Sequence, residues 1–197
     1  LRSQAHEAAN KLHTIVTMVE MGRPDDAVQF ATEELALSQQ LVDRLSSAVG
    51  EPALVALLLG KAAQADERGI ELTITEDTHL PSNSDDEVPL TGQEMVTVVG
   101  NLIDNAMDAC DRDDPWVEVT VHMVDDTLTV RVADSGPGMD PATFGKAMQR
   151  GYSTKDDSYH HGLGLALVSQ IVKRHNGKLS TDVTYGSVVT VTVGARS

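Results

Sequence analysis

The 197-residue chain has few of the residues that would mark a secreted or disulfide-rich protein. It contains one cysteine, Cys110, so no disulfide can form within the chain, and this composition fits a reducing cytoplasm. We interpret Cys110 as a small buried helix residue, because nothing nearby in the sequence would activate its thiol. Aromatic residues make up only 3% of a chain that is 41% hydrophobic, so we expect an aliphatic core.

Positive charge is also scarce. Lys and Arg number 15 against 30 Asp and Glu, and the net charge of -15 argues against nucleic acid or an anionic membrane surface as partner. A nucleotide is not excluded, because backbone N–H groups and a metal ion can hold phosphates. No apolar run reaches the length of a membrane span, and no signal peptide opens the chain. The chain starts inside an expected helix, so we expect an upstream part to be missing.

The hydrophobic pattern predicts two domains. Residues 1–49 are expected to form a helical hairpin, broken at residues 22–26, whose second helix has the apolar spacing of a coiled coil. One hairpin cannot bury both of its apolar stripes, so we expect a homodimer with a four-helix bundle. Residues 50–52 mark the boundary and a hinge. Residues 50–197 are expected to form an α+β sandwich, with helices on one face of a mainly antiparallel sheet. Helices are expected at 53–68, 91–111 and 163–175, and strands at 70–75, 116–123, 127–133, 178–184 and 187–193.

Two asparagines, Asn101 and Asn105, lie four residues apart in the helix expected over 91–111. This spacing places both carboxamides on one helix face, opposite apolar residues. A polar stripe on a packed helix needs a partner that satisfies it. Neutral amides turned toward a pocket suit a hydrated metal ion bound to phosphates better than they suit a core.

Three further motifs follow in order. The segment Asp134–Gly138 comes directly after a strand, where an aspartate can accept a hydrogen bond from an exocyclic amine such as adenine's, and its glycines let backbone approach a ligand. The segment Gly162–Leu165 opens a helix whose free N–H groups suit a phosphate. Between them, Ser153, Thr154 and Lys155 are candidates to face phosphates. Each motif alone is equally an ordinary turn, cap or loop, and it is their order that predicts a nucleotide site.

Together these motifs give residues 51–197 a resemblance to the ATP-binding domain shared by gyrases, heat-shock chaperones and sensor histidine kinases. The segment 101–109 is similar to its asparagine box, and 134–138 and 162–165 are similar to its glycine boxes. The resemblance implies that Asp134 reads adenine, that Asn105 holds Mg²⁺, and that residues 139–161 form a mobile lid. The residues it implies around ATP are Asn101, Asn105, Ala109, Asp134, Gly136, Gly138, Met139, Ser153, Thr154, Lys155, Gly162, Leu163, Gly164, Leu165 and Thr190. Asp108 departs from the pattern, because many kinases have a phosphate-contacting lysine there.

The ATP-hydrolysing members carry a glutamate, the general base, where this chain has Asn101. An amide is a poor base at pH 7, so the phosphoryl group is expected to be kept for another acceptor. In the hairpin, His6-Glu-Ala-Ala-Asn10 resembles the phosphoacceptor box of sensor kinases. His6 would attack the phosphorus, Glu7 would take the imidazole proton, and Asn10 would orient a water in the reverse reaction. A solvated helix residue is the alternative reading of a lone histidine, and His13, which lacks an acidic neighbour, is the less favoured acceptor.

The residues around His6 are most similar to the citrate/C4-dicarboxylate sensor subfamily. The resemblance implies a dimeric protein-histidine kinase that uses ATP and Mg²⁺ to phosphorylate His6, and then passes the phosphoryl group to an aspartate of a response regulator receiver domain. It also implies the cytoplasmic portion of a membrane receptor, attached to the membrane only through the missing upstream segment. Two other functions stay open. One is a phosphotransfer scaffold whose nucleotide domain has lost ATP, and the other is an anti-sigma-type serine kinase, which would not need the motif from His6 to Asn10.

Overall fold

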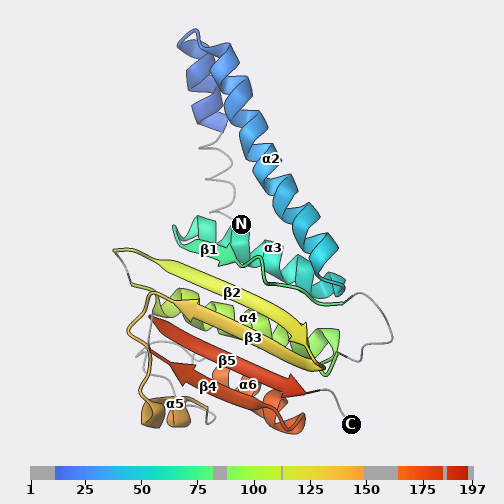
Figure 1. Ribbon diagram of the computed structural model, residues 1–197. Helices are drawn as coiled ribbons and strands as arrows, with labels where there is room; N and C mark the ends of the chain where they lie inside the picture. The colour runs from blue at the N-terminus through green and yellow to red at the C-terminus, as the bar shows by residue number, and fades with distance from the viewer. Residues whose placement is uncertain (1–11, 82–87, 112, 149–163, 184–185, 195–197) are drawn as a thin grey trace. The chain divides into compact units, whose positions relative to one another are not determined.

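The computed structural model describes residues 12–81, 88–111, 113–148, 164–183 and 186–194. The chain divides into two compact units, Leu1–Ser47 and Ala48–Ser197, and the predicted boundary lies two residues further along. In the first unit, residues 12–20 are helical, and α2 begins after a short turn and spans Pro24–Ala48 (Figure 1).

Local sequence explains where the first helical segment ends. Gly22 has a φ of +73°, the left-handed conformation that glycine adopts most readily. The N–H groups of Gly22 and Arg23 donate to the carbonyls of Val19 and Met18, at 3.0 and 2.9 Å, which satisfies the last turn of the helix. Pro24 then occupies the first position of α2, where its missing N–H costs nothing.

The second unit is built on a five-stranded sheet with the strand order β1-β2-β3-β5-β4. The strands are β1 Glu71–Ile74, β2 Trp116–Val124, β3 Thr127–Asp134, β4 Lys178–Asp182 and β5 Ser187–Gly194. β1 runs parallel to β2, and all other neighbours are antiparallel. The helices are α3 Pro52–Glu67, α4 Gly92–Ala109, α5 Pro141–Ala147 and α6 Gly164–Arg174. Figure 1 shows α4 and α6 behind the sheet, so the predicted α+β architecture is confirmed for this unit.

The sheet and the helices bury one aliphatic core between them, as the shortage of aromatic residues predicts. Successive strand residues point to opposite faces of a sheet, so every second residue of β2, β3 and β5 faces the helices. The buried side chains from α4 and these strands include Val98, Val99, Leu102, Ile103, Val119, Val121, Val130, Val132, Val191 and Val193.

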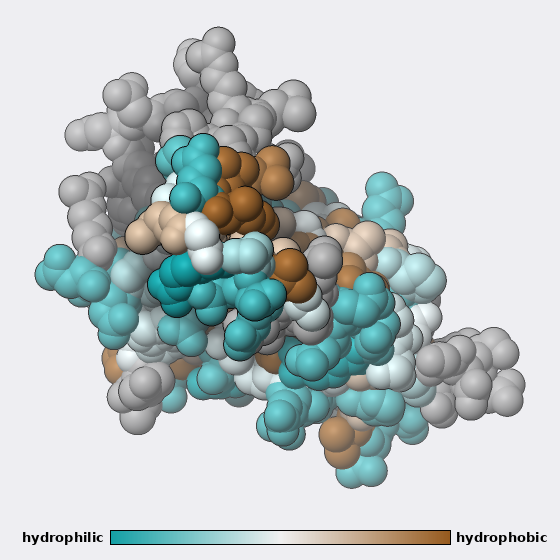
Figure 2. Space-filling model, turned by 90° about the horizontal axis from the view of Figure 1, so that it is seen from above, coloured by the Kyte–Doolittle hydropathy of each residue, from teal (hydrophilic) through white to brown (hydrophobic). Residues whose placement is uncertain are grey.

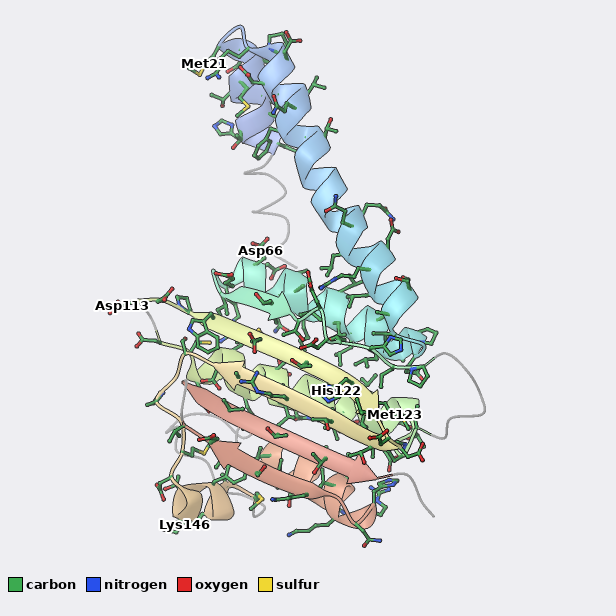
Figure 3. The ribbon with its side chains drawn as sticks, in the orientation of Figure 1. Met21, Asp66, Asp113, His122, Met123 and Lys146 are labelled. Carbon is green, nitrogen blue, oxygen red and sulfur yellow. The ribbon has the colours of Figure 1, made fainter. Side chains whose placement is uncertain are left out.

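The face of the sheet turned away from α4 and α6 is polar. Arg131 on β3 forms an ion pair with Glu118 on β2, and Thr75 donates a hydrogen bond of 2.9 Å to Thr120. His122 lies on the same strand and face as these β2 residues (Figure 3). The sheet therefore has one aliphatic face, packed on the helices, and one face with mostly polar side chains, of which Thr120 is buried.

A capping box at Thr91 fixes the start of α4, as the sequence predicts. The Glu94 N–H donates to Thr91 Oγ1 at 3.2 Å, and the Thr91 N–H donates to Glu94 Oε2 at 3.1 Å. Glu94 Oε1 also lies 3.1 Å from His175 Nε2 and 3.3 Å from an Arg174 nitrogen, both at the end of α6. Burial acts to raise the pKa of Glu94, but the hydrogen bonds from His175 and Thr91 outweigh it and hold the pKa below its ordinary value. The same carboxylate thus fixes α4 relative to α6.

The segment that joins the two units is paired to the second one. Val49 forms a parallel β-bridge with Leu80, in which the Leu80 N–H donates to Ala48 O at 2.9 Å and the Gly50 N–H donates to Leu80 O at 3.1 Å. Val49 and Leu80 are 3% and 1% exposed. His79 is bridged in turn to His122 of β2. The predicted hinge residue Gly50 is therefore hydrogen-bonded within the second unit.

The sequence does not predict α5, which lies inside the segment expected to form the lid. Asp140 is its N-cap and accepts hydrogen bonds from the Ala142 and Thr143 N–H groups, and Pro141 occupies the first helical position. The sequence feature that could have predicted the start of this helix is the pair Asp140-Pro141. Of the helices that the structure describes, none combines the length and the apolar character needed to cross a membrane.

Candidate nucleotide site

Asp134 stands at the end of β3, where the strand meets a glycine turn. It is 4% exposed, and its Oδ1 accepts a hydrogen bond of 2.8 Å from the Gly136 N–H. The hydroxyl of Ser187, at the start of β5, donates to the same carboxylate. Burial raises the pKa of Asp134 above its ordinary value, although the hydrogen bonds from Gly136 and Ser187 act in the opposite direction. A buried carboxylate that has two neutral donors and, among the described residues, no cationic partner is well suited to accept from a neutral N–H group of a ligand.

Two glycines bring backbone against Asp134. A Cβ on Gly136 would lie 2.3 Å from the carbonyl oxygen of Ala109 and 2.7 Å from Asp134 Oδ1. A Cβ on Gly186 would lie 2.1 Å from the carbonyl oxygen of Asp134, and Gly186 also has a φ of +64°. No side chain fits at either position. The turn after β3, the end of α4 and the start of β5 therefore meet around this carboxylate.

Ser135 joins the end of α4 to this turn. Its Oγ accepts hydrogen bonds from the Asp111 N–H at 3.1 Å and the Trp116 N–H at 3.3 Å. Cys110 is half-buried at the end of the helix and donates from Sγ to Trp116 O. Burial raises the pKa of the Cys110 thiol, which disfavours the reactive thiolate. The sequence predicts a buried helix residue here, whereas Cys110 is half-buried and directly follows α4.

Gly138 and Met139 continue the turn beyond Asp134. Gly138 has a φ of +71°, and a Cβ there would lie 2.5 Å from Val183 Cγ1, just after β4. Met139 is half-buried and immediately precedes the cap of α5. This part of the turn thus runs along β4 and β5 on the side of Asp134.

Asn101 and Asn105 lie on α4, one helical turn apart, but in different surroundings. Asn101 is half-buried, and its Nδ2 donates to Thr97 O at 2.7 Å. Its Oδ1 is directed toward the first residue of α6, because a Cβ on Gly164 would lie 2.7 Å from it. Asn105 is exposed, so its carboxamide is available to a ligand. Leu165, next to Gly164, is 7% exposed and packs into the core.

The fit of a magnesium ion can be judged from Asn105. Among the described residues, no group of three or more His, Cys, Asp and Glu side chains is placed to hold a metal ion. Mg²⁺ is commonly held by one or two protein oxygens together with substrate phosphates and water. One exposed carboxamide on α4 fits that mode and does not fit a site built from protein ligands alone.

Asp108 provides no phosphate contact of the kind a lysine would. Its Oδ1 lies 2.9 Å from Arg68 Nη2, and the same guanidinium nitrogen donates to Met107 O at 3.0 Å. Arg68 follows α3, so this pair joins the ends of α3 and α4.

A model of the histidine kinase-, DNA gyrase B-, and HSP90-like ATPase family matches residues 91–197. The chain belongs to this family. This ATPase-family chain is 34% identical over 185 residues to sensor protein CitS of Halalkalibacterium halodurans, an alignment that covers 91% of the chain and 33% of that protein. It is 32% identical over 185 residues to a probable C4-dicarboxylate sensor kinase of the same organism, with 92% and 34% covered. These matches confirm the predicted resemblance, and the chain spans about a third of the length of these curated relatives.

A solved structure has the same fold. Full-length ShkA, in complex with AMPPNP, superposes with a TM-score of 0.60 at 19% identity, covering 90% of this chain and 38% of that one. At this level of identity the likeness shows the fold alone.

The ATPase-family unit brings together only part of the predicted site. Asp134, Gly136 and Ala109 meet at the ends of β3 and α4, Gly138 lies against Val183 and Ser187, and Asn101 meets Gly164 between α4 and α6. The predicted residues that lie outside the described part of the chain are His6, Glu7, Asn10, Ser153, Thr154, Lys155, Gly162 and Leu163.

Thr190 does not lie with Asp134. In the register of β3 and β5, Asp134 is opposite Ser187, and Arg131 is opposite Thr190. Side chains alternate between the two faces of a strand, so Thr190 lies on the polar face of the sheet, away from α4 and α6. Ser187, three residues before Thr190, is the β5 residue that contacts Asp134. The sequence feature that could have identified Ser187 is its position directly after Gly186, where β5 starts beside the end of β3.

Proposed function

We propose that the chain is the dimerisation, phosphotransfer and ATP-binding part of a sensor histidine kinase, with residues 1–49 as the phosphotransfer hairpin and residues 50–197 as the catalytic domain. The buried Asp134 carries this proposal, because no cation among the residues that the structure describes pairs with its acceptor oxygens and the nearby backbone leaves no room for a side chain at Gly136 or Gly186. The exocyclic amine of adenine supplies a donor of the right kind. The relatives are named sensor kinases, and ShkA binds AMPPNP on the same fold, which supports a nucleotide at this site.

The phosphates would lie between α4 and α6. Asn105 would be the one protein ligand of Mg²⁺ on α4, and the first turn of α6, where the positive end of the helix dipole lies, suits an anion. Mg²⁺, when bound, would neutralise charge that develops on the phosphate oxygens. Asn101 is neutral and offers no base for water, so this unit would protect the γ-phosphoryl group from hydrolysis.

The acceptor in this proposal is His6. One imidazole nitrogen forms a bond to the γ-phosphorus while the bond between that phosphorus and the bridging oxygen of ADP breaks. Glu7 takes the proton from the other imidazole nitrogen, and ADP leaves. An aspartate oxygen of a response regulator then attacks the phosphorus and returns the electron pair to the histidine nitrogen. By the names of the relatives, the signal would be a carboxylate such as citrate or a C4-dicarboxylate.

A second copy of the chain would cover the first unit. Leu12, Val16 and Val19 lie on one side of the first helical segment and are 63%, 49% and 51% exposed, and Val28 on α2 is 66% exposed. Figure 2, seen from above the view of Figure 1, shows patches of apolar surface among hydrophilic surface. Pairing two hairpins into a four-helix bundle would bury these side chains. Light scattering that finds only the mass of one chain would contradict the dimer.

Labelling with γ-³²P ATP tests the activity. We expect acid-labile, alkali-stable label on the wild-type chain, no label on His6→Gln, and wild-type label on His13→Gln, whose side chain is exposed in the first helical segment. Label retained by His6→Gln would refute the acceptor assignment, and acid-stable label would point to a serine kinase instead.

The matched variant Asn105→Ala separates the two halves of the reaction. We expect it to take no label from ATP and still to accept phosphate from a phosphorylated response regulator. A wild-type chain that shows no Mg·ATP affinity in a binding titration would favour the non-catalytic phosphotransfer scaffold.

A further inference from the structure

The carboxamide of Asn101 occupies the space beside the first residue of α6. A Cβ on Gly164 would lie 2.7 Å from Asn101 Oδ1, 3.5 Å from its Cγ and 3.6 Å from its Cβ. Real Cβ atoms essentially never approach another heavy atom as closely as 2.7 Å, so a side chain at residue 164 would require the Asn101 carboxamide to move from its present position. Glycine at 164 is thus explained by a neighbour on another helix, since its φ is not in the left-handed region.

Asn101 is held in this orientation from its own helix. Its Nδ2 donates to the carbonyl of Thr97, four residues earlier, at 2.7 Å. This bond directs Oδ1 away from Thr97 and toward α6. The next residue, Leu102, is 2% exposed, and the preceding Gly100 is also buried, so the backbone that carries Asn101 is fixed by packing.

We propose that Asn101 is a positioning residue whose carboxamide fixes the N-terminus of α6 relative to α4. Asn101 then affects the affinity for the nucleotide through Gly164 and does not contact the nucleotide itself. α4 and α6 pack directly on each other, and Glu94 joins the start of α4 to the end of α6, far from Gly164. Asn101 sets the spacing of the two helices at the end where the phosphates would lie. That α6 binds the nucleotide phosphates rests on the proposed function. The contact between Asn101 and Gly164 does not depend on that function.

A double-mutant cycle between the two positions tests the proposal. Gly164→Ala introduces the overlapping methyl group, and Asn101→Ser shortens the opposing side chain while its hydroxyl can still donate to Thr97 O. We expect each single variant of the 197-residue chain to weaken Mg·ATP binding about tenfold, and the double variant to return to within about threefold of wild type, because the methyl group fills the space that serine leaves. The Kd is measured by calorimetric titration, and the urea unfolding midpoint without nucleotide should follow the same pattern.

Two control variants distinguish the positioning role of Asn101 from other causes of weaker Mg·ATP binding. Gly60→Ala adds a methyl group to helix α3 where nothing lies within 4 Å, so it should leave the Kd unchanged and raise the unfolding midpoint. Asn105→Ala removes the proposed Mg²⁺ ligand, and Gly164→Ala should not rescue it.

Additive losses in the Asn101→Ser and Gly164→Ala cycle would overturn the proposal, because they would mean that Asn101 contacts the nucleotide itself. Weakened binding in Gly60→Ala would overturn it as well. If the wild-type chain binds no Mg·ATP, the proposed function fails. The urea unfolding midpoints of the single and double variants then test the contact between Asn101 and Gly164 alone. An unfolding midpoint that returns toward wild type in the double variant then supports the positioning contact between Asn101 and Gly164, and additive destabilisation overturns it.

Discussion

Replacing Asp134 with asparagine should make the protein more stable and its nucleotide binding weaker. The two side chains have the same shape, so packing around the 4% exposed residue is kept. An asparagine oxygen can still accept from the Gly136 N–H, and the Ser187 hydroxyl can rotate to accept from the new NH₂ group. What changes is the charge, which burial disfavours.

The size of each effect follows from these contacts. Burying an ion costs several kcal/mol, and two hydrogen bonds to it return about 1.5–3 kcal/mol each, so we expect a net gain on the order of 1 kcal/mol for Asp134→Asn. For a unit of this size that gain raises Tm by about 2–4 °C. In the nucleotide complex, an NH₂ group would face the adenine amine in place of an acceptor oxygen. Loss of a charge-assisted hydrogen bond of about 1.5–3 kcal/mol weakens binding roughly 10- to 150-fold.

The pH dependence makes the prediction specific. A carboxyl whose pKa is higher in the folded protein is favourable to folding below its ordinary pKa of 3.8, and that contribution is lost as the pH rises through the folded value. The stability difference between Asp134→Asn and wild type should therefore be present at pH 7 and disappear below pH 3.8. Urea unfolding across this range and ATP titration at pH 7 measure the two effects. A variant that is less stable than wild type at pH 7 would refute the reasoning.

Two other substitutions test the architecture around the site. Gly186→Ala places a methyl group 2.1 Å from the Asp134 carbonyl at a φ of +64°, so it should destabilise by at least about 2 kcal/mol in thermal unfolding, whereas Gly145→Ala in α5 has open space and should not. The reasoning fails if both variants melt alike. Because the pKa of Glu94 is lowered, its stabilisation is present above the ordinary value of 4.5 and is lost as the pH falls through the folded value. Glu94→Gln should thus lose about 1 kcal/mol at pH 7 and almost nothing at pH 3, and an equal loss at both pH values would contradict it.

The fold of the second unit could be predicted because local patterns and long-range packing agree. The alternation in 116–123 and 127–133 became β2 and β3, and Thr91 with Glu94 gave the start of α4. The turn between β2 and β3 is formed by Asp125 and Asp126, with φ of 47° and 58°, values that aspartate tolerates better than most residues.

The site was harder to predict than the fold, because it depends on register and on contacts between helices. Thr190 and Ser187 are three residues apart in one strand, and only the pairing with β3 shows which of them faces Asp134. The approach of Asn101 to Gly164 joins residues that are distant in sequence, so no local pattern contains it. α5 was missed for another reason, since its short Asp-Pro signal lies in a segment that the glycines made to look irregular.

The bridge between Val49 and Leu80 restricts where the chain can bend. Its two hydrogen bonds fix Ala48 and Gly50 to the second unit, and Glu51 caps α3 while its carboxylate lies against Gly92 in the first turn of α4. Any rotation between the units that keeps these bonds has its pivot before Ala48. The residues that follow α2 are therefore an ordered part of the second unit and not a free linker.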